Sequence, residues 1–367
     1  MQKVKRFGVV FSGGTAAGMN ATLEYLCRYC TQQGAELIGF KYGWKGLISN
    51  DTVKVDMDST LGIGLEAGGT SLGSCSKINV FNHNGKDYSK ICYETYKSLR
   101  LDGIFVLGGD GTNRQANELN EKFPEMKFIW ISATLDRDVV GCDDTIGFHT
   151  AVENAAEDIA NMARDGKTMC RHTITECMGR NTGLVAIHAV DRALRENNDI
   201  AIDMVLVPEI EFNIEAICNR ISQAQYPLNI VISEGIVLDD TPDVPEKIVG
   251  HHKDLANTCK KLAAILQEFS LLPIKTGIVG YAQRTGKISS ADIFLAEHCA
   301  KLAVKEACTK NESMAIVFKD SAFCSMPMKE LVQENLKSDE KKKEKLLNDP
   351  VVNIIQDQLS AGAFRAI

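Results

Sequence analysis

Short apolar runs alternate with amphipathic stretches along almost the whole chain. Residues 7–11, 103–107 and 128–131 are nearly all apolar, and each run ends at glycine or a small polar residue. Segments with a helical spacing of apolar residues, such as 21–29 and 88–99, separate the runs. Because continuous apolar strands alternating with helices are typical of parallel sheets, we predict an α/β fold with helices on both faces of mostly parallel sheets.

The same alternation begins again near Arg171 and predicts a second domain. Further strands are expected at residues 172–175, 201–207, 228–232 and 274–279, with helices between them. The length of 367 residues agrees with two domains, since a domain typically has roughly 100–200 residues. The mixed-sign run 337–345 predicts a solvated helix near the C-terminus.

Composition and charge narrow the class of protein. Hydrophobic residues make up 44% and charged residues 24% of the chain, as in ordinary globular proteins. The net charge of −7 argues against a general nucleic-acid binder, which would need a basic surface. No apolar stretch approaches the length of about 20 residues that a membrane helix needs, and the first residues lack the apolar core of a signal peptide. We therefore expect a cytoplasmic protein without a membrane or nucleic-acid partner.

The cysteines are numerous but scattered. Twelve of them fall mainly in apolar segments, which predicts buried free thiols. Cys27 and Cys30 have the spacing of a C-x-x-C motif, but they lie inside a predicted helix, and no second pair is near them in the sequence. Zinc binding or redox chemistry stays open as the alternative.

Polar side chains follow the apolar run 128–131. Residues 132–138 read Ser-Ala-Thr-Leu-Asp-Arg-Asp, and they begin at the predicted carboxyl end of a strand, where open α/β sheets bind ligands. Asp136 and Asp138, together with the Thr134 hydroxyl, suit a site that removes a proton beside a metal or a phosphate. The alternative is a turn that caps the next helix.

Three glycine-rich loops lie between predicted strands and helices. Loops 12–20 and 67–77 offer backbone amides to an anion, although tight packing or a surface loop explains each equally well. The third loop, 108–112, reads Gly-Gly-Asp-Gly-Thr and combines amides, a hydroxyl and the Asp110 carboxylate, which are the groups that phosphoryl transfer with Mg²⁺ needs. Trp44 lies in another glycine-containing loop, where it either belongs to the core or stacks on a base.

The order of these motifs resembles the 6-phosphofructokinase family. The similarity rests on residues 12–20, 68–70, 108–112, 134–138, 145–148, 178–180, 208–209, 233–235 and 283–284, and it extends to about residue 307. The resemblance implies two Rossmann-like three-layer domains with the active site in the cleft between them. It places residues 1–147 and about 282–312 in a nucleotide- and Mg²⁺-binding domain. Residues 148–281 and about 313–367 would form a sugar-phosphate-binding domain.

The resemblance also implies a reaction. A phosphoryl group would pass from ATP, with Mg²⁺, to the 1-hydroxyl of fructose 6-phosphate and give fructose 1,6-bisphosphate in glycolysis. Asp136 would be the general base beside Thr134 and Asp138, Arg180 would steady the transferred group, and Asp110 would hold Mg²⁺. The nucleotide would contact Gly14, Trp44, Ser76, Lys77, Gly109, Asp110, Gly111 and Thr112. The sugar phosphate would contact Thr134, Asp136, Arg171, Met178, Gly179, Arg180, Glu234, Lys275, Tyr281 and Arg284.

A shared active site follows from the same resemblance. Arg171 and Lys275 would reach in from a neighbouring subunit, which implies a homo-oligomer, either a dimer or a tetramer. Several cations around one phosphate agree with electrostatics, and arginine adds bidentate hydrogen bonds.

Four positions depart from the family pattern. Ser76 and Lys275 each replace an arginine, Tyr281 replaces a histidine, and Arg137 replaces an asparagine. The change at Ser76 removes a cation beside the transferred phosphoryl group unless Lys77 substitutes for it, and the changes at Lys275 and Tyr281 weaken the grip on the sugar phosphate. Arg137 places a cation between two acids, where it either lowers their pKa values or points away.

Small residues favour ATP as the phosphoryl donor over diphosphate, the alternative donor. Gly111 and Ala133 stand where diphosphate-using relatives tend to carry Asp and Lys, so they leave room for a nucleotide. The effector site diverges as well. Glu24 and Met57 stand where bacterial relatives have basic residues for an effector phosphate, which implies weak or absent control by ADP and phosphoenolpyruvate.

Two rival functions remain open. Gly-Gly-Asp-Gly-Thr is also a signature of the NAD kinase and lipid kinase group, which does not account for residues 134–138. A non-catalytic regulatory homologue that binds sugar phosphate would account for the changes at Ser76, Arg137 and Tyr281. The intact acids at 110, 136 and 138 argue against it, since a site without chemistry has little need of a general base.

Overall fold

The computed structural model describes residues 4–58, 64–238, 248–249, 252–253, 257–336 and 338–358. The chain forms two compact units, one of residues 1–150 and 284–338 and the other of residues 151–283 and 339–367. Helices α6 (Phe148–Thr168) and α10 (Ala282–Thr285) cross from one unit into the other.

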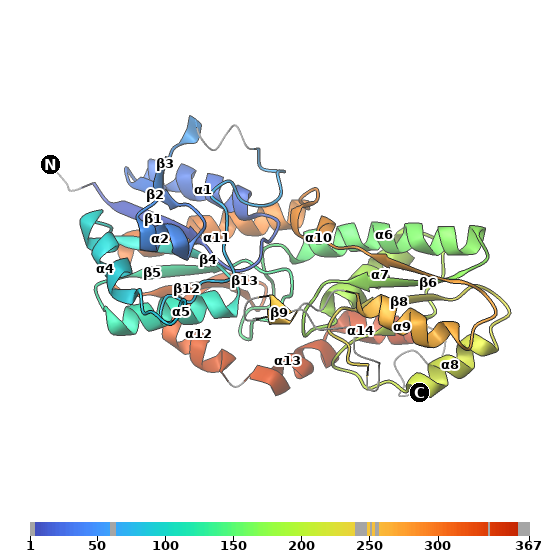
Figure 1. Cartoon of the computed structure of the whole chain (residues 1–367). Helices are drawn as coiled ribbons and strands as arrows, with labels where there is room; N and C mark the ends of the chain where they lie inside the picture. The colour runs from blue at the N-terminus through green and yellow to red at the C-terminus, as the bar shows by residue number, and fades with distance from the viewer. Residues whose placement is uncertain are drawn as a thin grey trace. The chain divides into compact units, whose positions relative to one another are not determined.

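A seven-stranded sheet forms the centre of the first unit, in the order β13-β12-β5-β4-β1-β2-β3 (Figure 1). Neighbours from β12 to β2 pair in parallel, whereas β3 and β13 add antiparallel edges. The strands are β1 (Arg6–Phe11), β2 (Glu36–Phe40), β3 (Thr52–Val55), β4 (Gly103–Gly108), β5 (Phe128–Ser132), β12 (Met314–Lys319) and β13 (Ala322–Pro327).

Helices cover both faces of this sheet. Helices α1 (Met19–Gln32) and α11 (Ser290–Thr309) pack on one face, around residues such as Val9 and Phe105. Helices α2 (Trp44–Ser49), α4 (Ser89–Ser98), α5 (Asp110–Lys122) and α12 (Met328–Asn335) pack on the other, around Val10 and Val106. Successive residues of a strand point to opposite faces, so two covered faces explain why these strands are apolar at every position.

The second unit contains a four-stranded parallel sheet in the order β11-β6-β8-β7. Helices α8 and α9 pack on one face, and Met162 of α6 lies on the other, against Gly277 of β11. The elements of this unit, with a short antiparallel pair, are β6 (His172–Cys177), α7 (Leu184–Glu196), β7 (Met204–Leu206), α8 (Ile214–Ser222), β8 (Asn229–Ser233), β9 (Ile248–Val249), β10 (His252–Lys253), α9 (Thr258–Gln267), β11 (Ile274–Ile278), α13 (Ser338–Leu347) and α14 (Pro350–Gln358).

The structure confirms the predicted α/β fold with mostly parallel sheets. The predicted strand 201–207 shortens to β7, and the helix predicted at 337–345 is α13, although residue 337 lies outside the described residues. Strands β12 and β13 were not predicted. Because β12 pairs with β5, residues 313–338 belong to the first unit, which corrects their assignment to the second domain. In the part of the chain that the structure describes, every helix is too short or too polar to cross a membrane.

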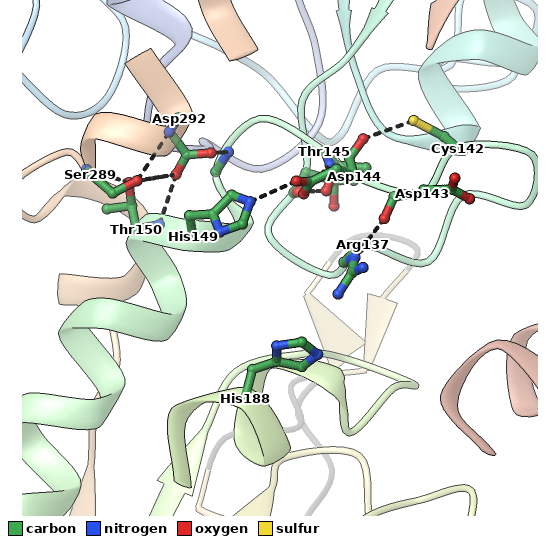
Figure 2. A network of polar contacts seen from close by, with 12 residues as sticks. Arg137, Cys142, Asp143, Asp144, Thr145, His149, Thr150, His188, Ser289 and Asp292 are labelled. Carbon is green, nitrogen blue, oxygen red and sulfur yellow. Dashed lines mark hydrogen bonds and ion pairs between the residues drawn. The ribbon is translucent and has the colours of Figure 1, made fainter. Parts of the chain in front are cut away.

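One buried carboxylate joins the first turns of two helices in the first unit. Ser289 Oγ caps α11 by accepting a hydrogen bond from Asp292 N at 3.1 Å. Asp292 Oδ1 accepts from Gly147 N at 2.7 Å, and Oδ2 accepts from Thr150 N at 2.7 Å and from Thr150 Oγ1 at 2.6 Å (Figure 2). Burial raises the pKa of Asp292, while these donors act in the opposite direction. Both oxygens are therefore needed to hold the start of α6 on α11.

The Asp292→Asn variant should lose about 2–4 kcal/mol of unfolding free energy in the first unit. An asparagine has a single oxygen, so its amide group must face one of the N–H donors at Gly147 or Thr150. Both tryptophans of the chain, Trp44 and Trp130, are buried in this unit, so urea unfolding followed by tryptophan fluorescence reports on it.

The matched control for this experiment is Asp51→Asn. The Asp51 side chain is 51% exposed and lies 3.6 Å from Lys41 Nζ, a surface pair worth less than about 1 kcal/mol. Equal unfolding midpoints for the two variants would contradict the role given to Asp292.

Candidate active site

Three loops meet where β1, β4 and β5 end. These strands are consecutive neighbours in the sheet and run in parallel, so their carboxyl ends lie on one edge. A Cβ on Gly13 would lie 3.7 Å from Thr112 Oγ1, and a Cβ on Gly109 would lie 3.7 Å from Thr134 Cβ. The first and third glycine loops and the segment 134–138 are therefore in contact, as the sequence suggested.

Glycine is required where these loops cross. A Cβ on Gly108 would lie 2.4 Å from Ser12 O, and Gly13 has a φ of 91°. The distance at Gly108 is shorter than any real Cβ contact, and the φ of Gly13 lies in the left-handed region that favours glycine. The sequence therefore brings the backbones of the two loops together in a way that any larger side chain would prevent.

Helix α5 begins at Asp110 and directs its first amides toward this edge. The Asp110 side chain is 16% exposed, and its Oδ2 lies 3.3 Å from Arg114 Nη2. The described residues contain no group of three or more His, Cys, Asp or Glu side chains that could hold a metal ion by themselves. A site built from one carboxylate at a helix N-terminus instead suits Mg²⁺ that is bound partly by phosphate oxygens. The residues present fit that metal.

The segment 134–138 has a defined local conformation. Asp136 N donates a hydrogen bond to Thr134 Oγ1 at 3.2 Å, and Arg137 adopts a left-handed φ of 53°. Arg137 Nε donates to Asp143 O at 2.6 Å (Figure 2). The guanidinium carbon of Arg137 lies 4.8 Å from the centre of the Phe148 ring. Of the two orientations considered for Arg137, the structure therefore shows the guanidinium engaged with residues 143 and 148.

The second glycine loop is attached to the first. Asn20 Nδ2 lies 3.2 Å from both Ala67 O and Gly68 O, and Asn20 Oδ1 accepts a hydrogen bond from Ser71 N at 2.8 Å. Ser74 Oγ donates to Gly13 O at 2.8 Å. The following residues, Ser76 and Lys77, are exposed.

Two expectations about small or aromatic residues need correction. Trp44 is completely buried and packs edge-on against Phe128, at 6.4 Å between ring centres, so it belongs to the core and does not present its ring to a base. Ala133 is 1% exposed and belongs to the core facing α1 and α11, so its small size does not open space for a nucleotide. Gly111 is different, because it is exposed and a Cβ there would meet no atom within 4 Å.

Arg284 lies against the first glycine loop. Arg284 Nη1 donates to Thr15 O at 3.0 Å, and a Cβ on Gly14 would lie 2.8 Å from that nitrogen. Arg284 therefore belongs to the first unit together with Gly14, whereas Tyr281, which was grouped with it by sequence, belongs to the second unit and is 77% exposed.

In the second unit, one carboxylate organises the loop that follows β6. Glu234 Oε1 accepts hydrogen bonds from Gly179 N at 3.2 Å and from Arg180 N at 2.9 Å. Met178 N donates to Gln283 Oε1 at 2.8 Å. These residues are brought together at the carboxyl ends of β6 and β8, as the parallel sheet requires.

Arg171 and Lys275 lie at the opposite edge of the same sheet. Arg171 immediately precedes β6, and Lys275 pairs with Thr173 near the beginning of β11. Arg171 Nε donates to Asp165 Oδ2 at 3.1 Å, and Lys275 is exposed. Within the second unit these two cations are therefore separated from Met178–Arg180 by the length of the strands.

Sequence reasoning missed the polar side chains that support the site. Asn20 was noted only as part of a glycine loop, and Asp144, His149 and Asp292 were not singled out. Asp292 follows Ser289 by three residues at the start of a predicted helix, which is the signature of a capping box and was a usable signal. The Asp144–His149 contact has no comparable local signature.

Most of the cysteines are buried, and Cys142 Sγ donates a hydrogen bond to Asp144 O at 2.8 Å. All twelve are free thiols, and Cys27 and Cys30 are buried in the core between α1 and α11. Burial raises the pKa of Cys30 far above its usual value, which suppresses thiolate chemistry. The prediction of buried free thiols is confirmed for most of them, whereas Cys170 is exposed.

Glu24 at the divergent effector position is also buried. Its side chain is 6% exposed and lies 3.0 Å from Arg28 Nη2, one helical turn later. The carboxylate is thus already engaged within α1.

The fold is shared with solved phosphofructokinases. It matches phosphofructokinase from Pichia pastoris with a TM-score of 0.78 and 19% identity, over 96% of this chain and 38% of that longer chain. It also matches a pyrophosphate-dependent phosphofructokinase from Marinobacter aquaeolei with a TM-score of 0.74 and 19% identity, over 89% of this chain and 84% of that one.

Sequence comparison gives the family. Residues 6–307 match the family described as Phosphofructokinase. The chain is 32% identical to ATP-dependent 6-phosphofructokinase 2 of Clostridium perfringens, over 83% of this chain and 86% of the relative. It is 29% identical to ATP-dependent 6-phosphofructokinase of Finegoldia magna, over 90% and 94% of the two chains. Matches of this extent, on the loops described above, show that the chain belongs to the phosphofructokinase family.

Proposed function

We propose that this protein transfers the terminal phosphoryl group of ATP to the 1-hydroxyl of fructose 6-phosphate. The observation that carries the proposal is the close approach of Gly109 to Thr134, where a Cβ on the glycine would lie 3.7 Å from Thr134 Cβ, so that the Gly-Gly-Asp-Gly-Thr loop lies beside the segment that holds Asp136. Backbone amides for phosphate and a carboxylate for a hydroxyl proton therefore occur at one edge of one sheet. Relatives named ATP-dependent 6-phosphofructokinase, at about 30% identity over most of the chain, support the choice of substrates.

Asp136 is the proposed general base, which takes the proton of the sugar hydroxyl as that oxygen attacks phosphorus. Thr134 stabilises this segment, since its hydroxyl accepts a hydrogen bond from Asp136 N. Asp138 is proposed to position substrate and metal beside the base. Arg137, between the two acids in the sequence, donates through Nε to Asp143 O and places its guanidinium over the Phe148 ring.

The phosphates of ATP are proposed to lie between the glycine loops of the first unit. Gly14, Gly109, Gly111 and Thr112 supply close backbone approach and amides, and Ser76 and Lys77 are exposed on the second loop. Asp110 is the residue that would hold Mg²⁺, which neutralises phosphate charge when it is bound. Trp44 is buried, so we do not propose that it contacts the nucleotide.

The sugar phosphate is proposed to contact residues of the second unit. Glu234 holds the loop 178–180, from which Arg180 presents its exposed side chain. Tyr281 and, from the first unit, Arg284 complete the proposed contacts of this chain. Arg171 and Lys275 lie at the other end of their strands, which supports the proposal that they serve the site of a neighbouring subunit in a homo-oligomer.

The Asp136→Asn variant should lower kcat by about 10²–10⁴-fold with fructose 6-phosphate and ATP, because an amide cannot accept the proton. A coupled assay that follows ADP production measures the loss. Asp51→Asn, which changes an exposed aspartate of the same unit, should keep the wild-type rate. Turnover that is insensitive to Asp136→Asn would rule out the proposed base, and wild-type protein inactive with both ATP and diphosphate would rule out the proposed reaction.

The Gly111→Asp variant tests the choice of donor. A Cβ at this position meets no atom within 4 Å, so the variant should fold. Its carboxylate should raise KM for ATP about tenfold or more, because it takes up space that the nucleotide phosphates need and repels their charge. Gly111→Ser, which adds a small neutral side chain at the same position, should retain most of the ATP-dependent activity. Wild-type protein that prefers diphosphate, or an aspartate variant with unchanged KM for ATP, would contradict ATP as the donor.

The buried Glu24 carboxylate predicts that ADP does not act as an effector at α1. Rates measured against fructose 6-phosphate at saturating ATP should show the same half-saturation and Hill coefficient with and without ADP, because a buried carboxylate paired with Arg28 offers no cation to an effector phosphate. A clear ADP-induced shift in cooperativity would refute this expectation.

A further inference from the structure

A second segment lies alongside the end of β5 and holds the residues that follow it. Ile146 N donates a hydrogen bond to Ser132 O at 3.2 Å, and Ala133 and Ile146 form a parallel bridge. Thr145 Oγ1 donates to Thr134 O at 2.7 Å. The backbone of Thr134, two residues before the proposed general base, therefore depends on where residues 145–146 lie.

Asp144 and His149 connect this second segment to the first turn of α6. Asp144 Oδ2 lies 2.6 Å from His149 Nε2, and Asp144 Oδ1 accepts a hydrogen bond from Thr145 N at 2.9 Å (Figure 2). Thr145 is the residue that bonds to Thr134 O. A continuous path of contacts thus runs from the imidazole of His149 through Asp144 and Thr145 to the catalytic segment.

The segment has further attachments that do not involve His149, including a hydrogen bond from Cys142 Sγ to Asp144 O at 2.8 Å. Asp143 N donates to Phe318 O at 2.7 Å, and Asp143 Oδ2 accepts from Asp320 N at 2.7 Å. Gly147 N donates to the buried Asp292. The Asp144 side chain is 16% exposed and the His149 side chain is 36% exposed, so the imidazole can still exchange protons with water.

Charged groups from three directions face His149. Asp144 lies on the loop before α6, Asp292 lies on α11, and Arg137 lies in residues 134–138. The Phe148 ring packs against the His149 ring at 5.5 Å between ring centres. Burial lowers the pKa of His149, but the hydrogen bond and charge of Asp144, helped by the charge of Asp292, outweigh both burial and the repulsion of Arg137. The net result is a pKa above the usual value of 6.5.

We propose that Asp144 and His149 are positioning residues, whose charged pair holds residues 134–138 in the geometry for phosphoryl transfer and loosens when His149 loses its proton. The inference rests on the proposed function, because it concerns the same site. Neither residue needs to touch a substrate. They act through the Thr145–Thr134 hydrogen bond.

The direction of the pH effect follows from the raised pKa. Below pH 6.5 the imidazole is protonated and the ion pair contributes fully to the positioning of the segment. As the pH rises through the folded-state pKa of His149, the ion pair becomes a neutral hydrogen bond, which is weaker but still present. The rate should therefore fall to a lower plateau on the alkaline side and should not fall to zero.

The test compares His149→Gln and His149→Ala with wild type, using kcat and KM for fructose 6-phosphate between pH 6 and 9. Glutamine keeps a hydrogen-bond donor that does not titrate, so His149→Gln should retain kcat within about threefold but lose the alkaline step. Alanine removes the contact, so His149→Ala should lower kcat about tenfold at every pH, with a smaller change in KM. His298→Gln is the matched control and should keep the wild-type profile, since His298 Nδ1 lies 2.9 Å from Phe294 O in its own helix and its ring stacks on Phe323.

Hydrogen exchange of the peptide 132–138 gives a second readout that does not need activity. After correction for intrinsic rates, wild type should show a loss of protection as the pH rises through the same step, and His149→Gln should not. An alkaline step that persists in His149→Gln, or glutamine and alanine variants that behave alike, would overturn the inference. If wild type transfers no phosphoryl group, the proposed function fails, and the exchange data alone then decide whether the pair controls the segment.

Discussion

Strand β4 is hydrogen-bonded along both edges to parallel neighbours, to β1 on one side and to β5 on the other. Because parallel strands end on the same edge about 4.8 Å apart, this pairing decides which loops can meet. One further strand between any two of them would separate Gly13 from Thr112 or Gly109 from Thr134. The glycines follow from the same constraint, since Gly108 and Ser12 O come too close for any Cβ. The candidate site is therefore a consequence of strand order before it is a consequence of any one side chain.

Arg137 shows how local backbone conformation determines the electrostatics of the site. A cation between Asp136 and Asp138 would hold both acids in their charged forms and weaken a base if its guanidinium lay between them. The left-handed conformation of Arg137 is accompanied by contacts with Asp143 O and the Phe148 ring. Arg137 thereby joins residues 134–138 to the loop that carries Asp144.

Local patterns in the sequence predicted the strands that carry the site, because strands covered on both faces are apolar throughout and glycine loops follow them. They did not predict β12, whose place in the first sheet depends on pairing with the distant strand β5, or β13, which pairs with β12. Residue type alone left Trp44 open between core and base contact and misplaced Ala133, because the direction of the side chain, at the start of α2 or just after β5, decides between core and site. The Asp144–His149 contact joins a loop to a helix start, and no helical or strand spacing marks such a pair.

Two carboxylates contact the first turn of α6, and they differ in burial and in the partners that they bind. Asp292 is fully buried and bonded through both oxygens, so any change in it costs the attachment of α6 to α11. Asp144 is partly exposed and contacts the His149 imidazole, whose charge changes near neutral pH. The strength of this contact therefore varies with pH, while α6 stays attached to α11 through Asp292. Because Asp292 keeps α6 in place, a change in the Asp144–His149 contact can shift the loop before α6 without unfolding the helix. Residues 134–138, which lie one hydrogen bond away through Thr145, are placed to respond to this difference.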